Sequence, residues 1–67
     1  MSDDIQKLKD EADKYLSMKV KHAAAEKLFE AASMLRERGE QAESTKLLVQ
    51  AVRLYEEEKK EKDADFF

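Results

Sequence analysis

The sequence predicts an all-α protein, a small antiparallel three-helix bundle with helices at about 3–18, 21–38 and 41–61. Its 67 residues include no proline and one glycine, and 43% are charged, which fits helices joined by very short connections. β-branched residues are few, which argues against a sheet. Apolar residues in the helical segments recur at the spacing of a helix face. The chain forms one domain, 1–67, and we expect residues 62–67 to be a flexible C-terminal tail.

The first segment has a narrow apolar stripe and no proline or glycine at its end. Ser2 is a suitable N-cap, and acidic residues follow it where the helix dipole favours negative charge. The stripe covers about 100° of the helix and comprises Ile5, Leu8, Ala12, Tyr15 and Leu16. Lys19 would fall on the apolar side of a continued helix, so we place the end near Ser17 or Met18 from the hydrophobic phase alone. The alternative is one continuous helix over 3–38, which would favour dimerisation.

The second and third segments form a hairpin around Gly39. The second has an apolar face of about 160°, in which alanines permit close helix approach while Leu28, Phe29 and Leu35 supply bulk. Basic residues precede Gly39 and acidic residues follow it, so both helix ends at the junction match their dipoles. Glycine at this position can take a positive φ without a Cβ penalty, which predicts a helix C-cap.

The third segment is apolar around too much of its circumference for a two-helix hairpin. Its apolar and small side chains cover about 240°, whereas a surface helix needs a stripe only a little wider than about 100°. These side chains are Ala42, Thr45, Leu47, Leu48, Val49, Ala51, Val52, Leu54 and Tyr55. A single core in so small a domain rarely supplies more than about 3–5 kcal/mol. We therefore expect a third helix, a second copy of the chain, or both to pack on this segment.

The hairpin resembles a single tetratricopeptide repeat (TPR). Residues with the size, order and spacing of that family are Leu28, Ala31, Ala32, Leu35, Gly39, Ser44, Leu48 and Ala51. The sequence departs from the family at Gln41, where the turn usually has an aromatic residue, and at Glu56, where a proline usually follows the second helix. The resemblance implies a scaffold that binds a peptide without chemistry. A single repeat also implies self-association or a stabilising third helix.

Two further resemblances imply the same class of function. Residues 25–32 are similar to repeats of the NSF attachment proteins. Microtubule-interacting-and-trafficking (MIT) domains are three-helix bundles whose first hairpin is TPR-like, whereas here the hairpin joins the second and third segments. The MIT-like resemblance implies an adaptor that binds helical tails in a groove between helices.

Composition and motifs argue against several other classes of function. The formal net charge of −3, without a long Lys/Arg cluster, disfavours nucleic acid and anionic membranes as partners. There is no cysteine, and His22 is expected to be solvent-exposed at a helix start, with no metal-binding pattern around it. We expect no enzyme activity, no catalytic residue, no cofactor and no metal. No apolar run is long enough to span a membrane and no signal peptide opens the chain, which favours a cytoplasmic location.

We therefore expect a non-enzymatic protein–protein interaction module. It would bind a partner helix or peptide through the apolar face around the third segment. The candidate contact residues are Phe29, Met34, Leu47, Leu54, Tyr55, Phe66 and Phe67. The alternative is a self-assembling structural homodimer, in which two copies bury the same residues and no separate ligand groove remains.

Overall fold

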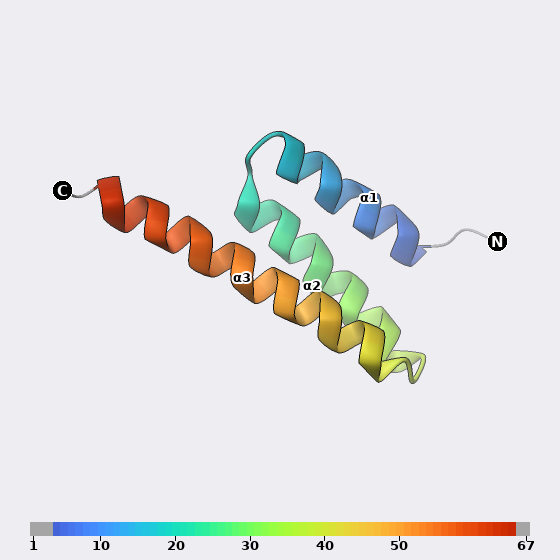
Figure 1. The fold of residues 1–67 in the computed structure, drawn as a ribbon. Helices are drawn as coiled ribbons and strands as arrows, with labels where there is room; N and C mark the ends of the chain where they lie inside the picture. The colour runs from blue at the N-terminus through green and yellow to red at the C-terminus, as the bar shows by residue number, and fades with distance from the viewer. Residues whose placement is uncertain (1–3, 66–67) are drawn as a thin grey trace.

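The computed structural model describes residues 4–65, with side chains to residue 61, and consists of three helices joined by short turns (Figure 1). α1 spans Asp4–Ser17, α2 spans Lys21–Glu37 and α3 spans Gln41–Asp65. The predicted all-α three-helix fold is confirmed. The break between α1 and α2 excludes the alternative of one continuous helix.

α3 is longer than we expected. Its predicted end lay near residue 61, but its backbone stays helical to Asp65. No proline or glycine interrupts this part of the chain, and Glu56 precedes Lys60 at the i,i+4 spacing that supports an exposed helix. Both features favour a helix that extends beyond its predicted end. The last two residues of the expected tail, 66–67, lie outside the described part of the chain.

The turn between α2 and α3 is a Schellman motif built on Gly39. Gly39 has a φ of 85°, in the left-handed region that glycine adopts without strain. The Glu40 N–H donates to the Leu35 carbonyl at 2.9 Å, and the Gly39 N–H donates to the Arg36 carbonyl at 3.0 Å. These bonds satisfy carbonyls that the end of α2 would otherwise leave unpaired. The predicted C-cap role of Gly39 is confirmed.

The turn between α1 and α2 repeats this geometry without a glycine. Lys19 takes the left-handed position, with a φ of 63°. The Val20 N–H donates to the Tyr15 carbonyl at 2.9 Å, and the Lys19 N–H donates to the Leu16 carbonyl at 3.0 Å. Because lysine is not a usual C-cap residue, the change of hydrophobic phase was the only sequence signal for this turn, and it placed the turn correctly.

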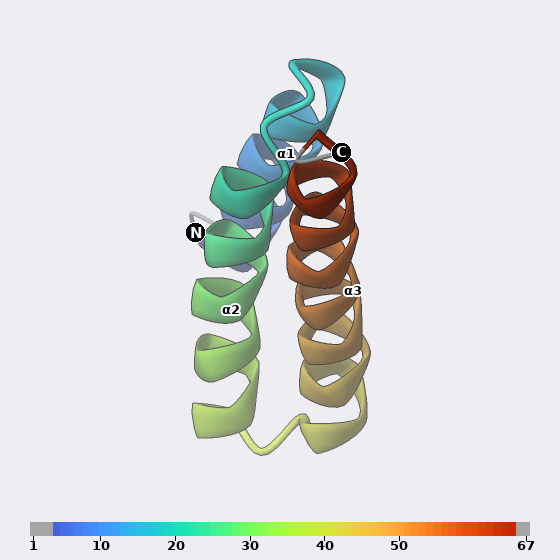
Figure 2. The ribbon, with the colours of Figure 1, turned by 90° about the vertical axis from the view of Figure 1, so that its left-hand side faces the viewer.

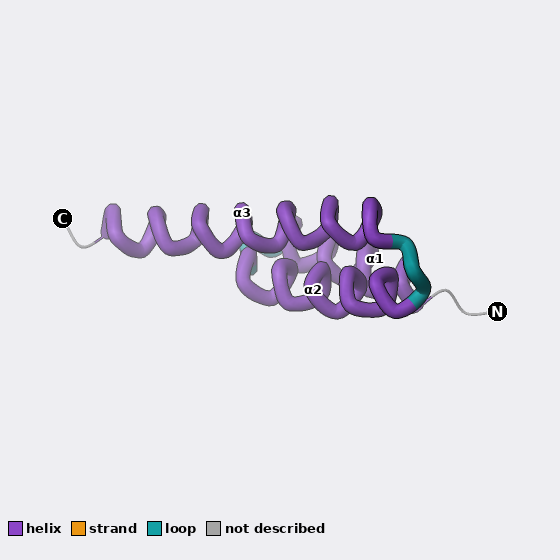
Figure 3. Tube along the Cα trace, turned by 90° about the horizontal axis from the view of Figure 1, so that it is seen from below, coloured by secondary structure: helices purple, strands orange, loops and turns teal. Residues whose placement is uncertain are grey.

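α2 is the central helix, and α1 and α3 pack against it from two sides. Figures 2 and 3 show α2 and α3 side by side, and Figure 1 shows that α1 and α3 run in the same direction, antiparallel to α2. No Cα atom of α1 lies within 8 Å of one in α3. The Cα trace is 21 Å wide but only 11 Å thick, which gives a flattened cross-section. The bundle is therefore open between its two outer helices.

Small side chains make up much of the core. The buried apolar residues are Ile5, Ala12, Ala24, Ala25, Leu28, Ala31, Ala32, Leu35, Leu47 and Ala51. The six alanines among them are at most 1% exposed, so the helices approach closely where alanine occurs. Between α2 and α3, the buried hydroxyl of Ser44 donates a hydrogen bond of 2.8 Å to the Ala32 carbonyl. A larger side chain at position 44 or 51 would push α3 away from α2.

α3 has one helical neighbour where we expected its wide apolar arc to be covered on two sides. The expected third helix, α1, packs on α2 instead. Leu48, Val49 and Val52 consequently remain 37%, 44% and 46% exposed. We call these three residues the outer face of α3, because they turn away from α2 while Leu47 and Ala51 turn toward it.

Candidate functional site

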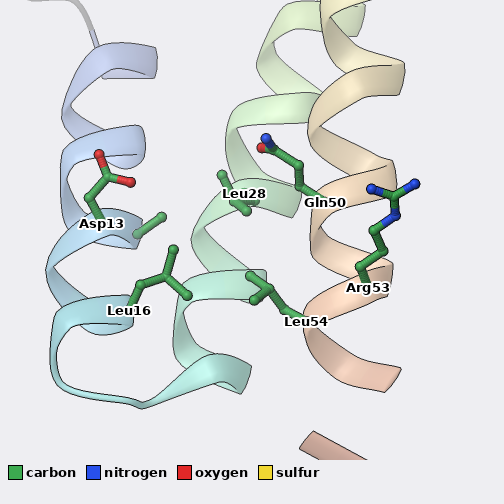
Figure 4. Close-up of a pocket in the computed structure, with 7 residues that line it drawn as sticks. Asp13, Leu16, Leu28, Gln50, Arg53 and Leu54 are labelled. Carbon is green, nitrogen blue, oxygen red and sulfur yellow. The ribbon is translucent and has the colours of Figure 1, made fainter. Parts of the chain in front are cut away.

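A groove lies between α1 and α3, with α2 as its floor. Figure 4 shows Leu16 from α1, Leu28 from α2 and Leu54 from α3 pointing toward one another in this groove. Together with the buried Ala12 they form what we call its apolar half, a hollow of about 280 Å³. Leu28 is 6% exposed, whereas Leu16 is 40% exposed, so the floor is buried and one wall remains open to solvent.

The groove continues along α2 toward the start of α1. A second hollow of about 360 Å³ shares Asp13, Leu28 and Gln50 with the first. Across it, Lys9 of α1 and Glu43 of α3 form an ion pair with an N–O distance of 3.4 Å. Both side chains are partly exposed, so the pair adds little to stability. We call this the polar half of the groove.

Lys9 on the α1 wall and Glu43 on the α3 wall neutralise each other, and the remaining charges of the two walls have opposite signs. Asp13 lies on the α1 wall, while Arg53 lies on the α3 wall of the apolar half and Lys46 on the α3 wall of the polar half. Figure 4 shows the Arg53 guanidinium pointing away from the groove floor. Among the side chains that the structure describes, these three charged groups make no ion pair with one another or with another residue. They are therefore available to a molecule that sits in the groove.

An ion pair on the other flank of α1 fixes which side of this helix faces the groove. The Nζ atom of Lys27 on α2 lies 3.5 Å from a carboxylate oxygen of Glu11 and 3.8 Å from one of Glu30. The negative charges of Glu30 and Glu11 raise the pKa of Lys27 above its ordinary value. Residues two apart lie about 200° apart around a helix. Because Glu11 turns toward Lys27, Asp13 turns toward the groove.

A second cluster of charges holds α3 against the start of α2, outside the groove. Lys21 donates a hydrogen bond to Glu61 and lies 3.5 Å from Glu57. The hydrogen bond to Glu61 and the negative charges of both carboxylates raise the pKa of Lys21 above its ordinary value. His22 is exposed, as predicted, and its Nδ1 lies 3.2 Å from both carboxylate oxygens of Glu58. This cluster joins two helices, and we assign it no chemistry.

Three of the contact residues expected from the sequence have different surroundings. Leu54 lines the apolar half of the groove, as a partner-binding residue would. Leu47 lines the polar half but is only 6% exposed, so it mainly supports the core. Met34 is partly buried against the core and lines neither half.

The expected aromatic contacts do not line the groove. Phe29 of α2 and Tyr55 of α3 stack on each other, with ring centroids 5.6 Å apart and an interplanar angle of 27°. Such a pair contributes about 0.5–1.5 kcal/mol beyond its buried area. It therefore helps to join α2 to α3 and is already used within the chain. Phe66 and Phe67 lie outside the described residues.

Sequence reasoning missed several residues that line the groove, including Leu16, Leu28, Asp13 and Arg53. The two leucines were correctly placed on apolar helix faces. The periodicity of each helix, however, does not specify which helix α1 packs on. No sequence signal marked Asp13 or Arg53, because both lie among many other charged residues.

Comparisons of the chain with protein-family models, with curated proteins and with solved structures found no match. The TPR-like and MIT-like resemblances therefore stay predictions. Within residues 4–65, no helix combines the length and the apolar character needed to cross a membrane. Among the side chains of residues 4–61, no three from His, Cys, Asp or Glu form a group that could hold a metal ion.

Proposed function

We propose that this protein is a non-enzymatic interaction module that binds an amphipathic helix of another protein in the groove between α1 and α3. The observation that supports this function is that both outer helices pack on α2 but not on each other. Leu16 and Leu54 therefore remain partly uncovered above the buried Leu28. A helix seated there would contact all three helices and close the bundle. The TPR-like adaptor role and the cytoplasmic location expected from the sequence are part of this proposal.

The apolar half of the groove would supply only part of the free energy of binding. Covering one exposed leucine completely contributes about 1.5–3 kcal/mol. Association costs at least about 4 kcal/mol in lost translational and rotational freedom. Since Leu16 is only 40% exposed, its burial alone cannot offset that cost. A partner therefore needs several apolar contacts in the groove together with polar contacts to the walls.

The test compares partners of the wild-type protein with those of Leu16→Glu and of Val52→Glu. Both residues are apolar and similarly exposed, at 40% and 46%, but only Leu16 lines the groove. Circular dichroism first establishes that both variants fold. Each candidate partner helix is then purified and titrated by calorimetry. A helix whose affinity falls with Leu16→Glu and survives Val52→Glu supports the proposal, whereas partners that are insensitive to Leu16→Glu contradict it.

A self-assembling homodimer is the second candidate function, favoured by the outer face of α3. Leu48, Val49 and Val52 are each more than a third exposed and line one shallow hollow together with Thr45, Arg53 and Glu56. A second copy packed there would cover them. Sedimentation over a concentration series tests this. A dimer that Val52→Glu dissociates would support it, and a monomer at every concentration would contradict it.

A further inference from the structure

We propose that the groove selects an amphipathic helix with charges of opposite sign on its two flanks, basic toward α1 and acidic toward α3. This inference rests on the proposed function and defines the chemistry of the partner. The occupant is one helix of another protein. Its large apolar residues, at i, i+3 and i+4 spacing, would lie against Leu16, Leu28 and Leu54.

The charges of the two walls determine which flanks fit. A helix that lies on the apolar floor has one flank beside α1 and the other beside α3. The flank beside α1 meets the carboxylate of Asp13, and the flank beside α3 meets Arg53 and then Lys46. None of these three groups has an ion-pair partner among the described side chains, so the helix could pair with them without breaking a bond of theirs. A flank of the wrong sign would place like charges side by side.

The two halves of the groove determine the length of the occupant and where its apolar residues lie. α1 has 14 residues, which corresponds to a wall about 20 Å long. An occupant of about four helical turns would match that wall. The Lys9–Glu43 pair crosses the polar half, so the large apolar residues belong at the Leu16 end of the groove.

Three synthetic peptides of about four turns probe this selection directly. All have leucine at every a and d position, so that leucines lie at the Leu16 end whichever way the peptide runs, and they differ only at the e and g positions, which flank the apolar stripe. The mixed peptide has lysine on one flank and glutamate on the other, the basic peptide has lysine on both, and the acidic peptide has glutamate on both. A covalent staple on the solvent-facing side keeps each peptide helical. The mixed peptide presents the correct flanks in one of its two directions, so the direction of binding need not be known.

Affinities are measured by fluorescence anisotropy at physiological salt, where the Debye length is about 8 Å and the net charge of −3 acts only at short range. The wild-type protein should bind the mixed peptide about two- to fivefold more tightly than either uniform peptide, as exposed ion pairs allow. Asp13→Lys makes both walls basic and should shift the preference to the acidic peptide. Arg53→Glu should make the α3 wall of the apolar half acidic and shift the preference to the basic peptide. Lys60→Glu, an equal change of charge outside the groove, should leave the order unchanged.

The outcomes separate failure of this inference from failure of the proposed function. If all three peptides bind equally and Leu16→Glu abolishes their binding, the charge selection is wrong and the groove function stands. A preference for the basic peptide by the wild type and every variant would also overturn the inference, because the net charge would then govern binding. If no peptide binds, or if Val52→Glu abolishes binding while Leu16→Glu does not, the groove is not the site and both proposals fail.

Discussion

Exchanging the residues at the two left-handed turn positions should change stability in opposite directions. Lys19 and Gly39 have φ angles of 63° and 85°, and their turns make the same pair of hydrogen bonds. A β-carbon in this region costs about 1–2 kcal/mol, whereas glycine costs about 0.4–1 kcal/mol through the entropy of the unfolded chain. The difference predicts that Lys19→Gly stabilises the protein by about 1 kcal/mol.

The reverse substitution should destabilise the protein by a similar amount. A β-carbon at Gly39 would meet no other atom within 4 Å, so the cost of Gly39→Ala comes from the backbone alone. That cost is again about 1 kcal/mol, net of the entropy that alanine removes from the unfolded chain. Because the two turns lie at opposite ends of α2, the effects should add. The double variant with Lys19→Gly and Gly39→Ala should therefore be close to the wild type.

Thermal and urea unfolding, followed by far-UV circular dichroism, measure these changes. A difference of about 1 kcal/mol corresponds to about 4–8 °C in Tm for a domain of this size. Lys19→Ala is the control, because it removes the charge but keeps the β-carbon. If Lys19→Gly melts at or below the Tm of Lys19→Ala, then strain at this turn does not limit stability and the reasoning is wrong.

Three further predictions concern the contacts between α2 and α3. Ala51→Leu should overpack their interface and lower the free energy of unfolding by about 1–3 kcal/mol in urea titrations, and an unchanged midpoint would contradict the close packing. Ser44→Ala removes the hydrogen bond to Ala32 and should cost about 1 kcal/mol; an equal loss in the exposed control Ser33→Ala would refute that assignment. The third concerns Lys21, whose pKa is raised in the folded state. The stability that its charge contributes should be fully present below the ordinary lysine pKa and be lost as the pH rises through the pKa of the folded state. The difference in urea midpoint between the wild type and Lys21→Met should vanish only at strongly alkaline pH, and a difference that persisted there would contradict the ionic origin.

The number of helices and their turns could be predicted because each depends on local chemistry. Gly39, with basic residues before it and acidic residues after it, marked one turn by residue type. Lys19 marked the other only by falling on the wrong side of an apolar stripe. The end of α3 was less predictable, since Glu and Lys residues at i,i+4 spacing support a helix without specifying where it stops.

The candidate site was harder to predict because it depends on which of the other two helices α1 packs against. The sequence indicated that α3 has more apolar surface than one neighbour covers, and the exposed Leu48 and Val52 bear this out. It did not indicate that α1 would pack on α2 and leave a groove beside Leu54. The packing partner of α1 is determined by how complete helix faces fit together, with alanines at the close contacts. No single residue in the sequence indicates it.

The open arrangement links the affinity of any ligand to the docking of α1. Among the described residues, α1 packs on α2 and contacts α3 through the partly exposed Lys9–Glu43 pair, so its docking depends mainly on α2. A ligand in the groove would touch α1 and α3 together and bind only the docked state. Its apparent affinity would then scale with the fraction of molecules in which α1 is docked. A smaller residue in place of the buried Ile5 would weaken the docking of α1 on α2. It would thus reduce binding without altering the groove surface.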